Sequence, residues 1–247
     1  MKLQNSKIYA HRGARAIAPE NTIPAFQAAL DMGVSGIELD VHCSKDGQLV
    51  VIHDFTVDAL TDGTGPIHNY TTHELAQLDA GSHFDQTFAG IGVPTLDQVL
   101  DLVGNRCEVN VEIKSMDPYG GDQVEPLIKT MQDRQLYDQI LVSSFSPITL
   151  IKMRVLAPDT RIGFLHEKLS TLYAEERWLG PLIQPEAVHP YHSLADDAYM
   201  QWAKDRSYAV NTWTVNDPVD AQRLAALGVD VIMSDVPDLI TGNIDHL

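Results

Sequence analysis

The chain has 247 residues, of which 44% are hydrophobic and 21% are charged, as is typical of a globular protein with a large core. Its 17 Lys and Arg against 34 Asp and Glu give a net charge of −17, which argues against nucleic acid or an anionic membrane as partner and suits a divalent cation. Two cysteines are too few for a disulfide framework, and neither a signal peptide nor the roughly 20 apolar residues of a membrane span occurs, so we expect a cytoplasmic protein without membrane insertion.

Strand patterns and helix patterns alternate along most of the chain. Strands are expected to begin at Lys7, Gly36, Glu108, Ile140, Arg161, Ala187, Tyr208 and Val229. Helices are expected over Ile23–Met32, from Thr95 or Asp97 to Val103, over Asp122–Arg134 and Pro147–Leu156, within Leu172–Leu179, and over Asp196–Arg206, Pro218–Leu227 and Pro237–Thr241. Eight strand–helix units without a glycine-rich dinucleotide motif favour a closed (β/α)8 TIM barrel, formed as a single domain by residues 1–247, over an open doubly wound sheet.

Residues 55–94 interrupt the alternation. A turn at Lys45–Gly47 and a short apolar strand, Gln48–Ile52, lead into this stretch, in which Asp62–Pro66 form a turn cluster and Thr71–Leu78 could form one short helix. We interpret it as an insertion after the second barrel strand, too polar and too short for an independent domain.

The ends of the expected strands carry polar and aromatic side chains. Glu38, Asp40 and His42 occupy alternate positions of one strand and therefore point to one face, with His53 shortly behind them. The other strands end with His11 and Arg12, Glu112 and Lys114, Ser143–Phe145, His189, Trp213–Asn216, and Ser234–Asp235. Because barrel enzymes carry their active sites at the carboxyl ends of the strands, we expect one polar site at this rim.

Glu38, Asp40 and Glu112 come from neighbouring strands and could share one cation. Oxygen ligands of this kind suit Mg²⁺, Mn²⁺ or Ca²⁺ rather than zinc. The alternative is a set of ordinary ion pairs, with Glu112 paired to Lys114.

His11 and His53 are candidates for a general acid and a general base, because imidazole titrates near neutral pH. Two histidines that are merely hydrogen-bonded are the alternative. The planar guanidinium of Arg12 suits a phosphate, or equally a structural ion pair.

Together these residues resemble the glycerophosphodiester phosphodiesterase family, in its bacterial, cytoplasmic type. The resemblance spans nearly the whole chain and rests on AHRG, PENT, GIELDVHCSKDGQLVVIHD, TDGTG, VPTLDQVL, VNVEIK, VSSFSP, NTWTVND and GVDVIMSDVPD, in this order. It implies a barrel with a small insertion after the second strand. The implied roles are an acid–base pair (His11, His53), ligands of Mg²⁺ or Ca²⁺, with Mn²⁺ a further option (Glu38, Asp40, Glu112), and substrate contacts (Arg12, Lys114, Phe145, His189, Trp213). His42 is not required by the family pattern and is expected to support its neighbours.

The implied reaction is metal-dependent hydrolysis of small glycerophosphodiesters, such as glycerophosphocholine or glycerophosphoethanolamine, to sn-glycerol 3-phosphate and an alcohol. In this scheme the glycerol hydroxyl next to the phosphate attacks phosphorus, the histidines move the protons, and water opens the cyclic phosphate. Which histidine acts first, which metal and alcohol are native, and whether the chain forms a homodimer stay open.

Three other functions share some of these sequence features. A phospholipase D-like barrel acting on lysophospholipids shares the histidines and acids, but that type is secreted and relies on disulfides. A Schiff-base aldolase would use Lys114, whose acidic neighbours favour the protonated amine instead. A catalytically silent barrel would act as a binding protein.

Overall fold

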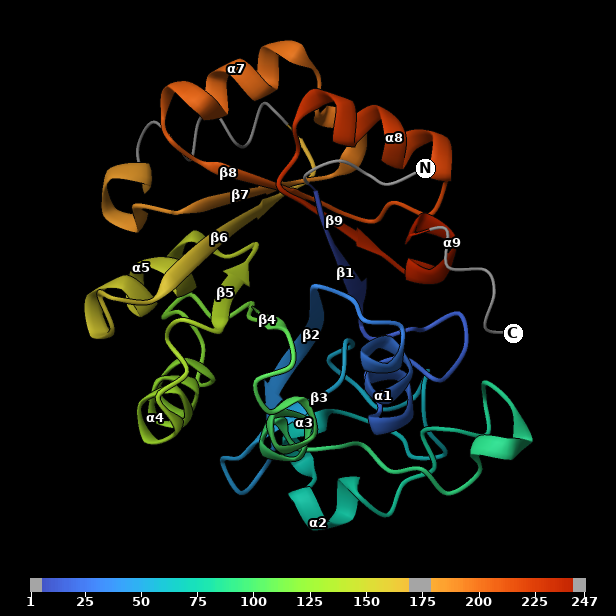
Figure 1. The fold of residues 1–247 in the computed structure, drawn as a ribbon. Helices are drawn as coiled ribbons and strands as arrows, with labels where there is room; N and C mark the ends of the chain where they lie inside the picture. Colours follow the sequence, from blue (N-terminus) through green and yellow to red (C-terminus); the bar gives the residue numbers. More distant parts are fainter. Residues whose placement is uncertain (1–5, 169–178, 242–247) are drawn as a thin grey trace.

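Eight parallel strands close into a barrel in this computed structural model, which describes residues 6–168 and 179–241. The strands are β1 (Lys7–His11), β2 (Gly36–Cys43), β4 (Glu108–Ile113), β5 (Ile140–Ser144), β6 (Arg161–His166), β7 (Ala187–Pro190), β8 (Ala209–Thr212) and β9 (Val231–Ser234). Each is hydrogen-bonded to its neighbours in the ring, and β1 closes it by pairing with both β9 and β2 (Figure 1). The expected (β/α)8 barrel is confirmed, with six of the eight strands beginning at the expected residue and β8 and β9 one and two residues later.

Helices cover the outside of the ring of strands (Figure 1). They are α1 (Ile23–Asp31), α3 (Leu96–Val103), α4 (Val124–Arg134), α5 (Pro147–Leu156), α7 (Asp197–Asp205), α8 (Pro218–Leu227) and α9 (Pro237–Thr241). Local sequence explains several of their starts: Thr95 and Gln98 form a capping box on α3, and Ser146 caps α5 just before a proline. The helix expected within Leu172–Leu179 lies outside the described residues except for its last one, and residues 179–183 are helical.

The inserted stretch follows β3 (Leu49–Val51), a strand antiparallel to β2. It contains only short elements among the described residues: η1 (Ile67–Asn69), α2 (Thr72–Leu75) and η2 (Gln86–Phe88) (Figure 1, cyan to green). A small core holds it against the barrel, made of Val50, Ile52, Val57, Ile67, Leu75, Ala80 and Val93. Because two of these residues belong to β3 and the residue after it, the stretch is anchored beside the carboxyl end of β2.

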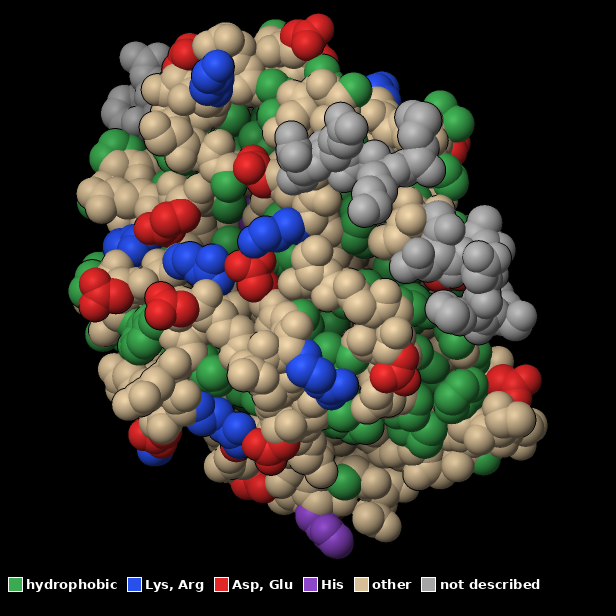
Figure 2. Space-filling model, in the orientation of Figure 1, with side chains coloured by type: hydrophobic (Ala, Val, Ile, Leu, Met, Phe, Trp, Pro, Cys, Tyr) green, Lys and Arg blue, Asp and Glu red, His purple; other side chains and the backbone are tan. Residues whose placement is uncertain are grey.

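Charged side chains occur in mixed groups on one face of the molecule (Figure 2). Figure 2 shows lysine and arginine side chains beside acidic ones across the face it draws. Such a distribution, on a chain of net charge −17, offers little attraction to a polyanion. Within the described residues, no helix combines the length and apolar character needed to cross a membrane.

A histidine is buried between β6 and α7. His166 is 3% exposed, its Nδ1 lies 3.3 Å from the Phe164 carbonyl oxygen, and its Nε2 lies 3.0 Å from the Tyr199 hydroxyl. Each nitrogen of the neutral imidazole therefore has a hydrogen-bond partner. Burial lowers the pKa of His166 from 6.5 to about 4.

The shift of His166 predicts a pH-dependent stability. Between pH 6.5 and about 4 the His166 imidazole is protonated in the unfolded chain but stays neutral in the folded chain. The free energy of unfolding therefore falls as the pH drops through this window. The contribution of this one group is roughly 3 kcal/mol at most. Denaturant unfolding of the wild type and of His166→Gln over pH 4–7 measures it. The variant should have the flatter profile, and parallel profiles would contradict the assignment.

Candidate active site

Three carboxylates meet at the carboxyl-terminal rim of the barrel. Glu38 and Asp40 lie on β2 and Glu112 lies on β4, and all three are buried. Asp40 and Glu112 are direct partners in the parallel β2–β4 ladder, and the side-chain alternation of β2 puts Glu38 on the same inner face. One oxygen from each of the three residues lies within 4.8 Å of the other two. The strand pattern thus brings together the three acids that the sequence suggested.

Two cations share this cluster of acids. Lys114 Nζ lies 2.7 Å from Glu112 Oε1 and 3.2 Å from Asp40 Oδ1, and Arg12 Nε lies 3.4 Å from Asp40 Oδ2. Glu38 accepts a hydrogen bond of 3.1 Å from the backbone N–H of Arg12, but no lysine or arginine side chain of the described chain forms an ion pair with it. The Glu112–Lys114 pair of the ion-pair alternative therefore exists, yet it leaves a third buried carboxylate uncompensated.

The pKa values report the same excess of negative charge. Burial, and then the charges of Asp40 and Glu112, raise the pKa of Glu38 well above its ordinary value. Burial, and then Asp40, raise the pKa of Glu112 to about 7. Burial also opposes ionisation of Asp40, but Lys114 and Arg12 outweigh it and lower the pKa of Asp40 to about 2. A further positive charge is needed for all three to ionise at neutral pH, and three oxygen donors fit a hard divalent cation.

His11 stands at the end of β1 beside Glu38, its partner in the β1–β2 ladder. Its Nδ1 lies 2.7 Å from Asp235 Oδ1, and its Nε2 lies 3.9 Å from Glu38 Oε2. Asn216 Nδ2 in turn donates to Asp235 Oδ2 at 2.8 Å. An aspartate on Nδ1 fixes the ring and leaves Nε2 facing the cluster of acids. Sequence reasoning put Asp235 at the rim without a role, although its place directly after β9, the strand next to β1, is the signal that could have linked it to His11.

His53 follows β3 and faces the site from the inserted side. Its Nδ1 lies 2.7 Å from Asp54 Oδ1. Burial lowers its pKa, although Asp40 acts in the opposite direction, so the neutral ring is favoured. His42 Nε2 donates to the carbonyl oxygen of His53 at 3.1 Å. This contact places His42 behind His53, where it supports the main chain.

The segment after β1 locks onto the cluster of acids through two residues with left-handed backbone. Arg12 has φ 57° and donates from its guanidinium to Glu20 Oε1 at 2.8 Å. Asn21 has φ 56° and donates from Nδ2 to Asp40 Oδ2 at 2.9 Å. Glu20 and Asn21 belong to the PENT motif, but sequence reasoning gave neither a role. The signal in the sequence was the position of Glu20 and Asn21, two polar residues shortly before the start of α1.

Aromatic rings form a wall at the rim. The rings of Phe145 and Trp213 lie 5.4 Å apart between centroids and edge to face, and Tyr191, which sequence reasoning did not single out, lies 5.6 Å from Trp213. Trp213 Nε1 donates to the His189 carbonyl oxygen at 2.8 Å.

The imidazole of His189 lies inside the barrel. It is 0% exposed and accepts from Asn211 Nδ2 at 2.9 Å, and burial, followed by the neighbouring His166, lowers its pKa to about 3. What His189 contributes directly to the rim is its carbonyl group, which positions Trp213.

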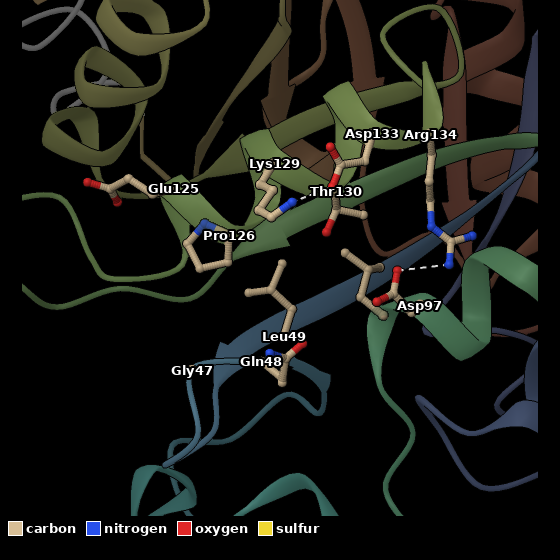
Figure 3. A pocket seen from close by; sticks show the side chains of 11 residues that line it. Gly47, Gln48, Leu49, Asp97, Glu125, Pro126, Lys129, Thr130, Asp133 and Arg134 are labelled. Atoms are coloured by element: carbon tan, nitrogen blue, oxygen red, sulfur yellow. Dashed lines mark hydrogen bonds and ion pairs between the residues drawn. The ribbon is translucent and has the colours of Figure 1, made fainter.

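A separate hollow of about 580 Å³ lies outside the barrel between β3, α3 and α4 (Figure 3). Its basic side chains are already paired: Lys129 Nζ lies 2.5 Å from Asp133 and Arg134 lies 2.9 Å from Asp97. The rim, with its uncompensated buried charge, is the better candidate for chemistry.

Comparison with known proteins relates the chain to one family. Residues 11–239 match the model of the glycerophosphoryl diester phosphodiesterase family. A glycerophosphodiester phosphodiesterase of Caldanaerobacter subterraneus subsp. tengcongensis is 37% identical over 236 residues, which cover 94% of this chain and 95% of the relative. A phosphodiesterase of Oleispira antarctica, solved in complex with the product sn-glycerol 3-phosphate, superposes with a TM-score of 0.87 at 28% identity, over 97% of this chain and 96% of that one. A glycerophosphodiester phosphodiesterase of Agrobacterium tumefaciens gives a TM-score of 0.83 at 30% identity, over 96% and 99% of the two chains. The chain therefore belongs to the glycerophosphoryl diester phosphodiesterase family of enzymes.

Proposed function

We propose that the protein hydrolyses small glycerophosphodiesters, such as glycerophosphocholine and glycerophosphoethanolamine, to sn-glycerol 3-phosphate and an alcohol. The observation that carries this proposal is the group of three buried carboxylates within 4.8 Å, flanked by two histidines that each contact an aspartate. The product bound in the Oleispira antarctica structure supports the same substrate class.

Glu38, Asp40 and Glu112 would hold one divalent cation, Mg²⁺ or Ca²⁺, with Mn²⁺ as a third option. Such a cation, when bound, neutralises charge on phosphoryl oxygens and polarises the phosphorus centre. Lys114 and Arg12, which stand against the same acids, add fixed positive charge where the equatorial oxygens gather charge in the transition state.

The histidines would move the protons. One ring takes the proton of the glycerol hydroxyl next to the phosphate as that oxygen attacks phosphorus, and the other gives a proton to the alcohol oxygen as its bond to phosphorus breaks. Water then opens the cyclic phosphate with the proton transfers reversed. Asp235 and Asp54 stabilise the charged form of His11 and His53 at Nδ1. Phe145 and Trp213 would cover the glycerol.

Removing either imidazole tests the acid–base roles. His11→Ala and His53→Ala should each lower kcat by about 100- to 10,000-fold, which is the usual contribution of a positioned proton donor or acceptor. Both variants should still unfold in one cooperative thermal transition, which shows that they are folded. Release of glycerol 3-phosphate from glycerophosphocholine measures turnover. The exposed His73, changed to Ala, is the control and should retain full activity. More than a few per cent of activity in both variants would sink the assignment.

Chelation tests the cation. EDTA should abolish turnover and Mg²⁺ or Ca²⁺ should restore it, because without metal Lys114 and Arg12 compensate the three acids only in part and no divalent cation binds the phosphate. Glu38→Gln and Asp40→Asn should need higher metal concentrations for half-maximal activity, whereas the exposed Asp97→Asn should behave as wild type. Activity that survives exhaustive EDTA treatment would exclude metal-dependent catalysis.

Asp235 is expected to act through His11. Asp235→Asn should lower kcat by roughly 10- to 100-fold with little change in KM, the usual effect of losing the partner that orients a functional imidazole. The pH dependence of kcat should also move, because the imidazolium loses its carboxylate. The control is Asp159→Asn, at an exposed acid between α5 and β6, next to the amino end of β6 and therefore at the end of the barrel opposite the rim. An unchanged pH profile in Asp235→Asn would reduce Asp235 to a structural residue.

A further inference from the structure

A second cavity adjoins the cluster of acids. It has a volume of about 430 Å³ and lies between the end of β2, the loop that follows β4 and the inserted stretch. Lys114 lines this cavity and also pairs with Asp40 and Glu112, so the cavity borders the proposed phosphate position. His42, which holds the carbonyl group of His53, is a second lining residue shared with the site.

The lining of this cavity is mixed: apolar and acidic side chains stand beside Lys114, two histidines and neutral polar residues. Phe55, Ile67 and Met116 contribute apolar surface, with Phe55 46% and Met116 82% exposed. Asp117 and Asp122 contribute carboxylates. The ring of Phe55 stands edge to face with His42, 5.0 Å between centroids, which fixes its orientation beside the cavity. Large apolar side chains left open next to catalytic groups are typical of a binding surface.

In-line displacement connects this cavity to the reaction. The attacking and leaving oxygens lie on opposite sides of phosphorus. The two rings of the proposed glycerol wall, Phe145 and Trp213, follow β5 and β8, and β1 and β2 lie across the ring of eight strands from this pair. The leaving alcohol therefore points away from this wall, toward the end of β2 and the inserted stretch, where the cavity lies.

We infer that this cavity binds the alcohol portion of the diester and favours alcohols that carry an ammonium group. The inference rests on the proposed function and adds which alcohols the site prefers and which residues cause the preference. A quaternary ammonium presents methyl groups and a positive charge, which an aromatic ring and nearby carboxylates attract together. Lys114, the cation of this lining, already faces Asp40 and Glu112, which reduces its repulsion of a positively charged head group.

Substitutions in the lining should discriminate between alcohols. Phe55→Ala removes a cation–π contact and Asp117→Asn removes a nearby negative charge, so each should lower kcat/KM for glycerophosphocholine by roughly 3- to 30-fold, mainly through KM. Both should change kcat/KM for glycerophosphoglycerol, whose alcohol is neutral, by less than about threefold. Phe84→Ala removes another exposed phenylalanine of the inserted stretch, outside the lining, and should leave both substrates unchanged.

Equal losses for the two diesters, or no loss for either, would overturn the inference. A wild type that hydrolyses neither diester would overturn the proposed function instead. The inference is then decided by NMR titration of the Mg²⁺-loaded protein with choline and with 3,3-dimethylbutan-1-ol, its neutral isostere. Choline should bind more tightly to the wild type, and Phe55→Ala should remove most of the difference. Equal binding of the two compounds would contradict the inference.

Discussion

The burial of three like charges at one barrel rim is the constraint on which the rest of the site depends. Glu38, Asp40 and Glu112 bring oxygen atoms within 4.8 Å of one another in positions withdrawn from water. Carboxylates in such a place repel one another and lose their hydration. The surrounding groups offset part of this cost: Lys114 and Arg12 by charge, and the backbone N–H of Arg12 by a hydrogen bond to the acid that lacks a cationic partner.

Barrel closure delivers the catalytic candidates to this cluster of acids. The β1–β2 pairing sets His11 opposite Glu38, and the β2–β4 pairing sets Asp40 opposite Glu112. Asp235 reaches His11 because β9 is the other neighbour of β1. Four strands from both ends of the chain thus meet at one place, which an open sheet with separated edges would not achieve.

Sequence periodicity was enough for the barrel and for the cluster of acids, because strand starts and side-chain alternation are local properties. Depth within the barrel was not readable. His189 sits on an inner face near a strand end, as the rim residues do, yet its ring is fully buried, because strand register and tilt decide which inner positions reach the rim. The Asp235–His11 contact, the roles of Glu20 and Asn21, and the cavity beside Lys114 depend likewise on loop paths between distant segments, which no pattern in one sequence specifies.

Arg12 and Asn21 have an unfavourable backbone conformation that allows their side chains to contact Asp40. Each is a non-glycine residue with positive φ, a conformation that costs of order 1 kcal/mol or more. In return each directs a donor at Asp40, at 3.4 Å from Arg12 Nε and 2.9 Å from Asn21 Nδ2. Gly13, with φ 81°, permits the tight turn between them, because a Cβ there would lie 2.7 Å from the Ala25 backbone. The backbone of the segment after β1 therefore adopts the conformation that brings donors to Asp40 on β2. The apolar core between the strands and the helices stabilises the fold enough to maintain this conformation.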